Sequence, residues 1–553
     1  MTVIRVAGFA GENRAMQPQL LPEDAATVSL NHKPGRGDLR PWKAPLAVAT
    51  VPSDRKTIHR MQPSAPNELL DTQYWLSWTS RVHAVRGFNG TTELVYFTGD
   101  GAPKIADNTV LDGTDPQANP ATTYLLGLPA PTNAPTVATT GTLETGDALE
   151  TYYYVYTFVN ALGWESAPSP VSAANTRGVN QGATVSVFND IVSGAFKAPT
   201  SIRVYRTQAG TTGSAGFFYM GEVAYADTTF SDVGQNMGEV CATTTWLPAP
   251  GVPTGGAEPI TESNLTNLTA LWNGMKAGIT DGAVRFCEAH VLYAWPIGYD
   301  VVPPSGKAVA LGVVGQQLLV LTDGRPLLVA GSSPDSMDAQ PLEIPQACVS
   351  AASVVSMGFG VVWASMDGLM FYAPGGARNL TAGVMTRDDW LAIKPETIVG
   401  QMYEGRYLGS YLVGGVRKGF IIDPAGGGIY FLSTGYEAMY FDEQLDQLFV
   451  LDGTTVKRWD AGAALEFTWK SKVFYKQFPT QMACAKLLTE ATVMAPVTFK
   501  LWADGVLVHT QTVTNSQPFR LPSCIHTNWQ FEVSGTSSVQ AIVMGGSMAE
   551  LVQ

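Results

Sequence analysis

The sequence predicts an all-β fold: an irregular β-propeller with an inserted immunoglobulin/fibronectin III-like β-sandwich and a C-terminal β-sandwich. The composition is the first indication, because only 15% of the 553 residues are charged whereas Gly (56) and Pro (35) are abundant. Low charge with many turn-forming residues favours short strands over helices. The second indication is a hairpin unit that recurs along the chain, and the third is a pair of proline-rich linkers around one block of it.

The recurring unit is an apolar strand, a tight turn rich in Asp and Gly, and a second apolar strand. It occurs at five places: Leu94–Ile105, Leu318–Val329, Val361–Tyr372, Phe420–Phe431 and Leu448–Trp459. An Asp-Gly pair between apolar runs predicts a type I′ hairpin turn, in which both central residues have positive φ. Repetition of such strand pairs is typical of propeller blades. The unequal intervals between the turn aspartates at 323, 367, 423 and 452 leave the blade number open.

These patterns divide the chain into five parts. Residues 1–65 predict an extended N-terminal arm, because prolines such as Pro22 and Pro52 interrupt any helical period. We expect this arm to lie across other domains or a neighbouring subunit, since a solvated tail would expose Leu39 and Trp42 to water. The remaining parts are the first part of the propeller (residues 66–127), the inserted β-sandwich (128–250), the remainder of the propeller (251–464) and the C-terminal β-sandwich (465–553).

The inserted domain is bracketed by twin linkers, Leu128–Pro131 and Leu247–Pro250, whose stiffness would fix its direction. Within it, Thr151–Asn160 places alternate side chains on two faces, as expected for a strand of a small β-sandwich. Two helices are predicted in the later propeller segment. An apolar stripe with helical spacing predicts one over Asn264–Met275, and Thr386 is a suitable N-cap for a second, short helix.

The sequence predicts no catalytic, cofactor-binding or metal-ligating residue, and no cofactor. The five cysteines are odd in number and widely spaced, which favours reduced, buried thiols over a disulfide framework. Cys287 and His290 are three residues apart, but no second pair completes a four-ligand metal site. Gly545–Ala549 differs from a nucleophile elbow in its final Ala and lacks the strand–turn–helix context.

Acidic residues need separate consideration, because glycoside hydrolysis requires two carboxylates on either side of one bond. Glu23–Asp24, Asp388–Asp389 and Asp442–Glu443 are each interpreted as a helix cap or a solvated loop. The turn aspartates are interpreted as turn-forming residues, which tolerate positive φ. We therefore expect a protein that is not an enzyme. A glycan-binding role stays open, because 13 Trp and 20 Tyr offer stacking surfaces, although most of them alternate within strands.

Three patches of the sequence are distinctive. The first runs from Gly11–Glu12 to Gly37–Pro41, the second is Val159–Pro170, and the third comprises Phe519–Pro522, Trp529 and Ala549–Leu551. Together they resemble the tail nozzle (tail tube B-like) proteins of short-tailed bacteriophages, the podoviruses. The resemblance implies a homohexameric ring of propellers below the portal and adaptor, which extends the DNA-ejection channel and anchors fibres, spikes or a plug. It implies no catalytic residue, and the residues that line the DNA channel stay unknown.

The charge of the chain agrees with a conduit that does not bind DNA specifically. With 34 Lys+Arg and 47 Asp+Glu the formal net charge is −13, so six copies would carry 6 × −13 = −78. Such acidity would repel the phosphate backbone from a channel wall, or it would serve solubility alone. With no signal peptide or membrane span expected, we predict a virion tail component that assembles in the host cytoplasm. The alternative is a tail-associated, glycan-binding adhesin that recognises the host receptor.

Overall fold

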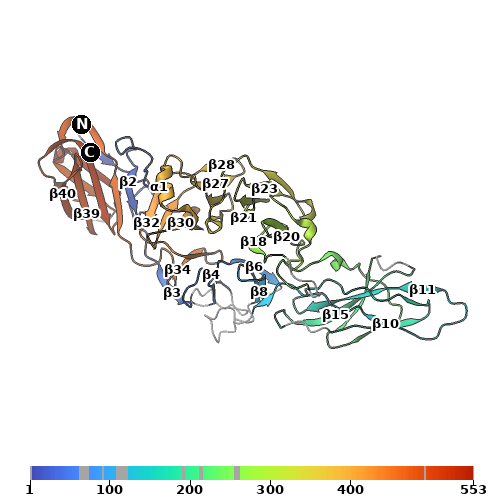
Figure 1. The fold of residues 1–553 in the computed structure, drawn as a ribbon. Coiled ribbons are helices and arrows are strands. Elements are labelled where there is room, and N and C mark those ends of the chain that lie inside the picture. The colour runs from blue at the N-terminus through green and yellow to red at the C-terminus, as the bar shows by residue number, and fades with distance from the viewer. Residues whose placement is uncertain are drawn as a thin grey trace.

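The computed structural model describes residues 3–61, 72, 74–89, 92–107, 123–189, 194–210, 216–254, 262–490 and 493–551. Three β-rich modules lie in a row, and the fold is all-β as predicted (Figure 1). The inserted sandwich forms one end, the propeller the middle, and the C-terminal sandwich the other end, where both chain termini lie. The described residues include one α-helix, α1 (Arg387–Ala392), which begins after Thr386 as predicted. Short 3-10 turns are η2 (Ala242–Thr245), η3 (Ile297–Tyr299), η4 (Pro334–Ser336), η5 (Ala351–Ser353), η6 (Pro395–Thr397) and η7 (Met548–Leu551).

The propeller consists of seven antiparallel sheets within the described part of the chain. Five of them contain the hairpins that the sequence predicts, each as two adjacent strands of one sheet. The first three sheets are β4 (Thr57–Arg60) with β5 (Trp75–Trp78); β6 (His83–Asn89), β7 (Thr92–Thr98), β8 (Lys104–Asp107) and β9 (Tyr124–Leu125); and β18 (Thr266–Ala270), β19 (Lys276–Thr280) and β20 (Ala283–Phe286).

Three of the four later sheets of the propeller contain four strands that are consecutive in the chain. The last sheet has three consecutive strands and gains its fourth from the N-terminal segment. The four sheets are β21 (Ala308–Val314), β22 (Gln317–Thr322), β23 (Leu327–Ala330) and β24 (Asp338–Pro341); β25 (Val355–Ser356), β26 (Val361–Ala364), β27 (Leu369–Ala373) and β28 (Gly376–Asn379); β29 (Val399–Tyr403), β30 (Arg406–Val413), β31 (Val416–Ile422) and β32 (Ile429–Leu432); and β33 (Ala438–Asp442), β34 (Gln447–Asp452) and β35 (Thr455–Arg458) with β3 (Leu46–Thr50).

The sheets close into a ring through shared hydrophobic clusters. Each sheet packs against the next through buried side chains contributed by both. Between the last and the first sheet, Phe449 and Val456 pack with Ile58 and Trp75. Strand β3 pairs with β35, so the N-terminal and C-terminal strands of the propeller lie in one sheet. Residues 46–60 of the predicted arm therefore belong to the propeller, and this pairing holds the ring closed.

The inserted domain is a sandwich of small antiparallel sheets. Its strands are β10 (Thr136–Thr140), β14 (Gly182–Ser186) and β17 (Thr229–Asp232); β12 (Tyr154–Asn160), β15 (Pro199–Arg206) and β16 (Phe218–Ala224); and β11 (Leu149–Tyr152) with β13 (Asn175–Gly178). Strand β12 is the predicted tyrosine-rich strand. Tyr154 and Tyr156 face the large sandwich core, whereas Val155 packs on the opposite side with Tyr205 and Phe217. The predicted alternation of faces is confirmed, and both faces are covered.

The C-terminal module places two sheets around one core that includes Trp469, Phe499 and Trp529. One sheet has the order β1 (Ile4–Val6), β43 (Ala541–Gly545), β38 (Cys484–Leu488), β41 (Phe519–Arg520). The other contains β2 (Ala26–Leu30), β36 (Phe467–Ser471), β42 (Ile525–Gly535), β39 (Val493–Ala503), β40 (Val506–Asn515) and, beside β42, β37 (Phe474–Gln481). Strand β2 pairs with β36 and, at Leu30, with β32 of the propeller. The N-terminal segment therefore joins two modules through one continuous sheet.

The helix predicted over Asn264–Met275 is wrong, because this segment forms β18 and a turn. Asn267 and Asn273 adopt the left-handed conformation, with φ of 53° and 55°, which ends any helical run. The register between β18 and β19 shifts between Thr266 and Thr269, as in a β-bulge. Because of the extra residue, Leu265 and Leu268 are both buried although they are three residues apart, which imitates helical spacing.

The type I′ turns do not occur at the Asp-Gly pairs for which the sequence predicts them. At Asp367-Gly368 and Asp452-Gly453 only the glycine has positive φ, and at residues 323–324 neither residue does. Both central residues have positive φ at other pairs, namely Asp281-Gly282, Glu404-Gly405, Gly414-Gly415 and Asp504-Gly505. The hairpins exist as predicted, but these Asp-Gly pairs do not adopt the expected turn geometry.

Candidate functional site

The turn aspartates lie on four different sheets, and each has its own set of partners. Asp323 accepts a hydrogen bond from the backbone N of Lys307 (2.7 Å), and Asp423 accepts one from the backbone N of Ala425 (2.8 Å). Asp367 accepts a hydrogen bond from Gln346 Nε2 (3.1 Å), and Asp452 pairs with the ammonium of Lys457 (2.6 Å). Asp423 and Asp452 bond within their own hairpins, whereas Asp323 and Asp367 bond to preceding segments 16 and 21 residues away, and the four do not converge on one site.

The acidic doublets have three different roles. Asp388–Asp389 lies in the first turn of α1, where the hydroxyl of Thr386 accepts a hydrogen bond from the backbone N of Asp389 (3.1 Å), as predicted for a helix cap. Glu23–Asp24 is exposed. For Asp442 the prediction of a helix cap or a solvated loop is wrong. Its carboxylate is fully buried and accepts a hydrogen bond from Arg60 Nε at 2.5 Å. Its partner is 382 residues away in the sequence, so no local pattern indicates the pair.

The sequence candidates for metal or nucleophile chemistry are structural. Cys287 is fully buried and its Sγ accepts a hydrogen bond from the backbone N of Lys276 (3.0 Å), while burial raises the pKa of its thiol to about 12. Gly545–Ala549 leads from β43 into η7, where the Glu550 carboxylate accepts a hydrogen bond from Gly546 N. Among the described residues, no group of three or more His, Cys, Asp or Glu side chains could hold a metal ion.

A cavity of about 540 Å³ lies on the propeller axis. It is lined by the first strands of six sheets, β4, β6, β18, β25, β29 and β33, so the ring arrangement itself creates it. Its polar lining includes His59, His83, Arg86, Tyr440 and Glu443. This volume lies in the range of small-molecule pockets. The cavity is therefore far too small to enclose a nucleic acid duplex.

The electrostatics of this cavity favour uncharged imidazoles. Burial, together with the nearby Arg86, lowers the pKa of His59 to about 3. Burial together with Arg81 lowers the pKa of His83 to about 4. The guanidinium of Arg86 is paired with the buried carboxylate of Glu93 at 2.6 Å. At neutral pH both imidazoles are therefore uncharged, and they lie beside the Arg86–Glu93 ion pair.

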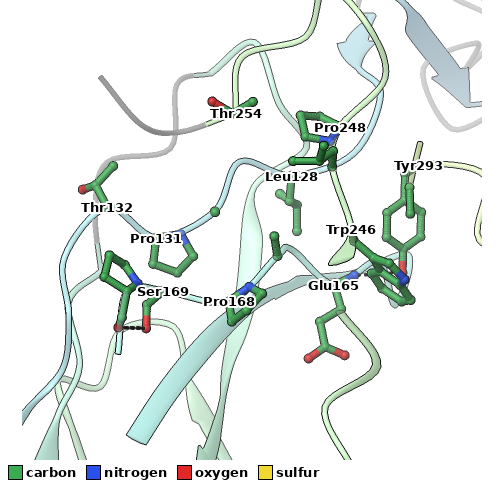
Figure 2. Close-up of a pocket in the computed structure, with 15 residues that line it drawn as sticks. Leu128, Pro131, Thr132, Glu165, Pro168, Ser169, Trp246, Pro248, Thr254 and Tyr293 are labelled. Atoms are coloured by element: carbon green, nitrogen blue, oxygen red, sulfur yellow. Dashed lines mark hydrogen bonds between the residues drawn. The ribbon is translucent and has the colours of Figure 1, made fainter. Parts of the chain in front are cut away.

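A second cavity, of about 360 Å³, lies where the inserted sandwich joins the propeller (Figure 2). Both predicted linkers line it, and proline rings form much of its wall: Pro131, Pro168, Pro170 and Pro248. Trp246 packs edge to face against Tyr293 at one side, with ring centroids 5.7 Å apart. The cavity is a predominantly apolar hollow between two stiff linkers, and sequence reasoning identified the linkers without predicting it.

The carboxylate of Glu165 accepts several hydrogen bonds at this junction. Thr157 Oγ1 (2.6 Å), Tyr205 OH (2.5 Å) and Arg203 (2.8 Å) all donate hydrogen bonds to it. The backbone N of Glu165 donates to Tyr293 OH at 3.0 Å, which links the sandwich to the propeller segment. Burial raises the pKa of Tyr293 to about 12, so this phenol stays protonated. The network fixes the junction and leaves no free acid in it.

The segment after Glu165 protects one edge of β12 by a serine ladder. The backbone N atoms of Ser166, Ser169 and Ser172 donate to carbonyls of Phe158, Tyr156 and Tyr154, each at 2.9 Å. In return, the three serine hydroxyls accept hydrogen bonds from the backbone N atoms of the same strand residues at 3.0 to 3.1 Å. The three-residue serine spacing matches the period of a polyproline II strand. This ladder accounts structurally for part of the distinctive patch Val159–Pro170.

Comparison with known proteins gives no family assignment. No protein-family model matches the sequence, and no curated protein matches it significantly. Solved structures give weak matches: AztD of Citrobacter koseri (9% identity, TM-score 0.25, 70% of this chain and 99% of that chain covered) and PorZ of Porphyromonas gingivalis (9%, 0.26, 85% and 77%). A glycoside hydrolase family 43 arabinoxylan arabinofuranohydrolase of Bacillus subtilis matches at 10% identity and TM-score 0.17, with 76% and 94% covered. At such TM-scores these matches carry no inference about function. In the described chain, no helix has both the length and the apolar character to cross a membrane.

Proposed function

We propose that the chain is a structural virion protein, one subunit of a homohexameric tail nozzle that extends the DNA-ejection channel. The observation that carries the proposal is that the N-terminal segment contacts both the propeller and the C-terminal sandwich. We call these contacts of residues 10–30 the N-terminal seam. Gly11 N donates to the carbonyl of Gly427 (2.9 Å) in the propeller, and Trp469 Nε1 of the C-terminal sandwich donates to the carbonyl of Ala10 (3.0 Å). A long subunit whose modules are held together by such a seam is suited to a mechanical role between neighbouring subunits rather than to catalytic turnover.

The seam includes buried polar contacts that leave little room for relative motion. Glu12 is 3% exposed, and its carboxylate accepts hydrogen bonds from Arg14 Nε (2.5 Å) and from the backbone N of Ser29 (2.9 Å). A Cβ placed on Gly11 would lie 2.8 Å from the backbone of Ile429, so only glycine fits there. These residues belong to the first patch that resembles the nozzle family, which supports reading that patch as the module seam.

The small axial cavity supports a channel between subunits rather than through one. Six chains around a common axis would carry a formal charge of 6 × −13 = −78. Acidic walls repel phosphates over about a Debye length, roughly 8–10 Å in physiological salt. In this arrangement the DNA would pass without being bound, and the end modules would meet the portal and adaptor on one side and fibres, spikes or a plug on the other.

The test is the symmetry of the purified protein. Native mass measurement and low-resolution electron microscopy should give rings of six copies with an axial opening, and filter binding should detect no stable complex with duplex DNA. A monomer or trimer that binds host polysaccharide on a glycan array would refute the nozzle and favour a glycan-binding adhesin. Loss of a hydrolytic activity on replacing Asp367 or Asp452 by Asn would instead indicate an enzyme.

A further inference from the structure

The C-terminal sandwich has an open sheet edge at β40. This strand is the last in its sheet, so about half of its backbone groups point away from β39. Its ten residues include no Asp, Glu, Lys, Arg or Pro. Its pairing with β39 is regular from His509 to Val513. Strands of this length and composition at a sheet edge form ready templates for pairing with another chain.

The opposite border of the same sheet is protected, which makes the open edge at β40 notable. Strand β37 carries Lys476 and Pro479, and its register with β42 is interrupted between Tyr475 and Thr480. A charge, a proline and an irregular register are the usual means by which proteins prevent edge-to-edge association. Strand β40 carries neither a charged residue nor a proline, and its own register shifts with β39, between Val493 and Val497 and between Leu501 and Trp502, leave the run from His509 to Val513 regular.

Exposed apolar side chains extend this edge at the end of the sheet that holds the β39–β40 turn. Asp504 in that turn accepts a hydrogen bond from Asn528 N (3.0 Å) and pairs with His526 (2.8 Å), which places the turn against the start of β42. Around it, Val506 on β40, Ile525 on β42 and Phe478 on β37 are 65%, 63% and 71% exposed. Aromatic and aliphatic side chains at this level of exposure are typical of surfaces that are covered in an assembly.

We propose that β40 pairs through its open edge with the backbone of a second copy of this chain and forms part of the contact between subunits. The choice of a second copy follows from charge. Copies with a net charge of −13 repel one another, and like charges placed face to face across an interface cost several kcal/mol. Between Asp504 and Arg520 the chain has no Asp, Glu, Lys or Arg, so two copies can approach here without that cost. This inference rests on the proposed function where it places the contact in a ring.

The test introduces charge at the edge without touching the core. Thr512 and Thr514 are exposed and lie on the face of β40 opposite the buried Val513. We expect Thr512→Glu/Thr514→Glu to weaken self-association at least tenfold, measured by analytical ultracentrifugation. The control is Thr498→Glu, which places one such charge directly across from Thr512 but on the interior strand β39 and is compared with Thr512→Glu alone as well as with the double variant. The control should assemble like the unmodified chain, and circular dichroism should show the same fold for all four proteins.

Hydrogen exchange provides a direct second readout. In the assembled unmodified chain the amides of Val506–Asn515 should exchange at least tenfold more slowly than in the Thr512→Glu/Thr514→Glu variant. A ring that survives the double substitution, or in which these amides exchange as fast as in the variant, overturns the inference and leaves the nozzle standing. A smaller oligomer with slow exchange at β40 supports the inference and refutes the nozzle. A monomer with fast exchange at β40 refutes both.

Discussion

The buried ion pair between Arg60 and Asp442 should be the most sensitive point in the closure of the propeller. It joins β4 of the first sheet to β33 of the last, and the exposed fractions of the two side chains are 1% and 0%. Asp442 also caps the turn after β33, because its Oδ1 accepts hydrogen bonds from the backbone N atoms of Gln444 (2.9 Å) and Leu445 (3.2 Å). Asp442→Ala removes all of these contacts and leaves the buried guanidinium of Arg60 without this carboxylate.

The expected cost is large because the remaining charge cannot reach water. Removing one partner of a buried ion pair destabilises proteins by about 3–5 kcal/mol. Replacing both partners with apolar side chains of similar volume is often neutral or stabilising. We therefore expect Asp442→Ala to open the junction between the first and last sheets, and Arg60→Met/Asp442→Leu to recover most of the loss. The order of stability, with the double variant above the single one, is the distinctive result.

Hydrogen exchange with mass spectrometry can localise the effect to β4 and β33. A loss of 3–5 kcal/mol corresponds to amide exchange that is about 10²–10⁴-fold faster in these strands. The control is Asp452→Ala, which breaks the Lys457–Asp452 pair in the same sheet, where Asp452 is 54% exposed. Exposed pairs contribute about 0–1 kcal/mol, so this variant should change exchange by less than a few fold. Equal effects of Asp442→Ala and Asp452→Ala would refute the reasoning.

Three further predictions follow from local geometry. Gly11→Ala should loosen the N-terminal seam, because its Cβ would collide with the backbone of Ile429; limited trypsin digestion should then cut at Arg14 faster than in the unmodified chain. Thr386→Ala should lower the free energy of unfolding by about 1 kcal/mol through loss of the cap on α1, and Thr386→Ser should restore it, as thermal denaturation can show. Burial lowers the pKa of His32 to about 4, so its contribution to stability is present above pH 6.5 and lost as the pH falls toward 4; urea unfolding across this range should show a decline of roughly 3 kcal/mol that is absent in His32→Gln.

Local signals in the sequence predict the strand pairs of the propeller but not all of its sheets. Five hairpins were identifiable because their two strands are adjacent in the chain and flank a turn of Asp and Gly. The sheet of β18–β20 could not be predicted, because a bulge at Asn267 gives its buried leucines helical spacing. The pairing of β4 with β5 could not be predicted either, because β4 lies in the proline-interrupted arm and β5 lies at the start of the propeller segment. Periodicity is informative only where a strand is regular.

The candidate sites show the same division between local and distant determinants. The cap at Thr386 and the turn contact of Asp423 depend on neighbours within a few residues and could be predicted. The axial cavity and the Arg60–Asp442 pair depend on segments hundreds of residues apart, which only ring closure brings together. Closure in turn depends on β3 reaching β35, a pairing for which no adjacent turn provides a signal.

The distribution of protected edges links this fold to assembly. Where β12 would end a sheet inside the subunit, the chain covers its edge with the serine ladder of Ser166, Ser169 and Ser172. Where β37 borders solvent, a lysine and a proline guard it. Within the described part of the chain no strand pairs with the outer edge of β40, and the strand itself has no Asp, Glu, Lys, Arg or Pro, although the chain uses such means elsewhere. A soluble monomer would retain an aggregation-prone edge at this position, whereas an assembly that pairs β40 removes that hazard and gains a contact. The unguarded edge is therefore best explained by a function that requires copies of the chain to associate.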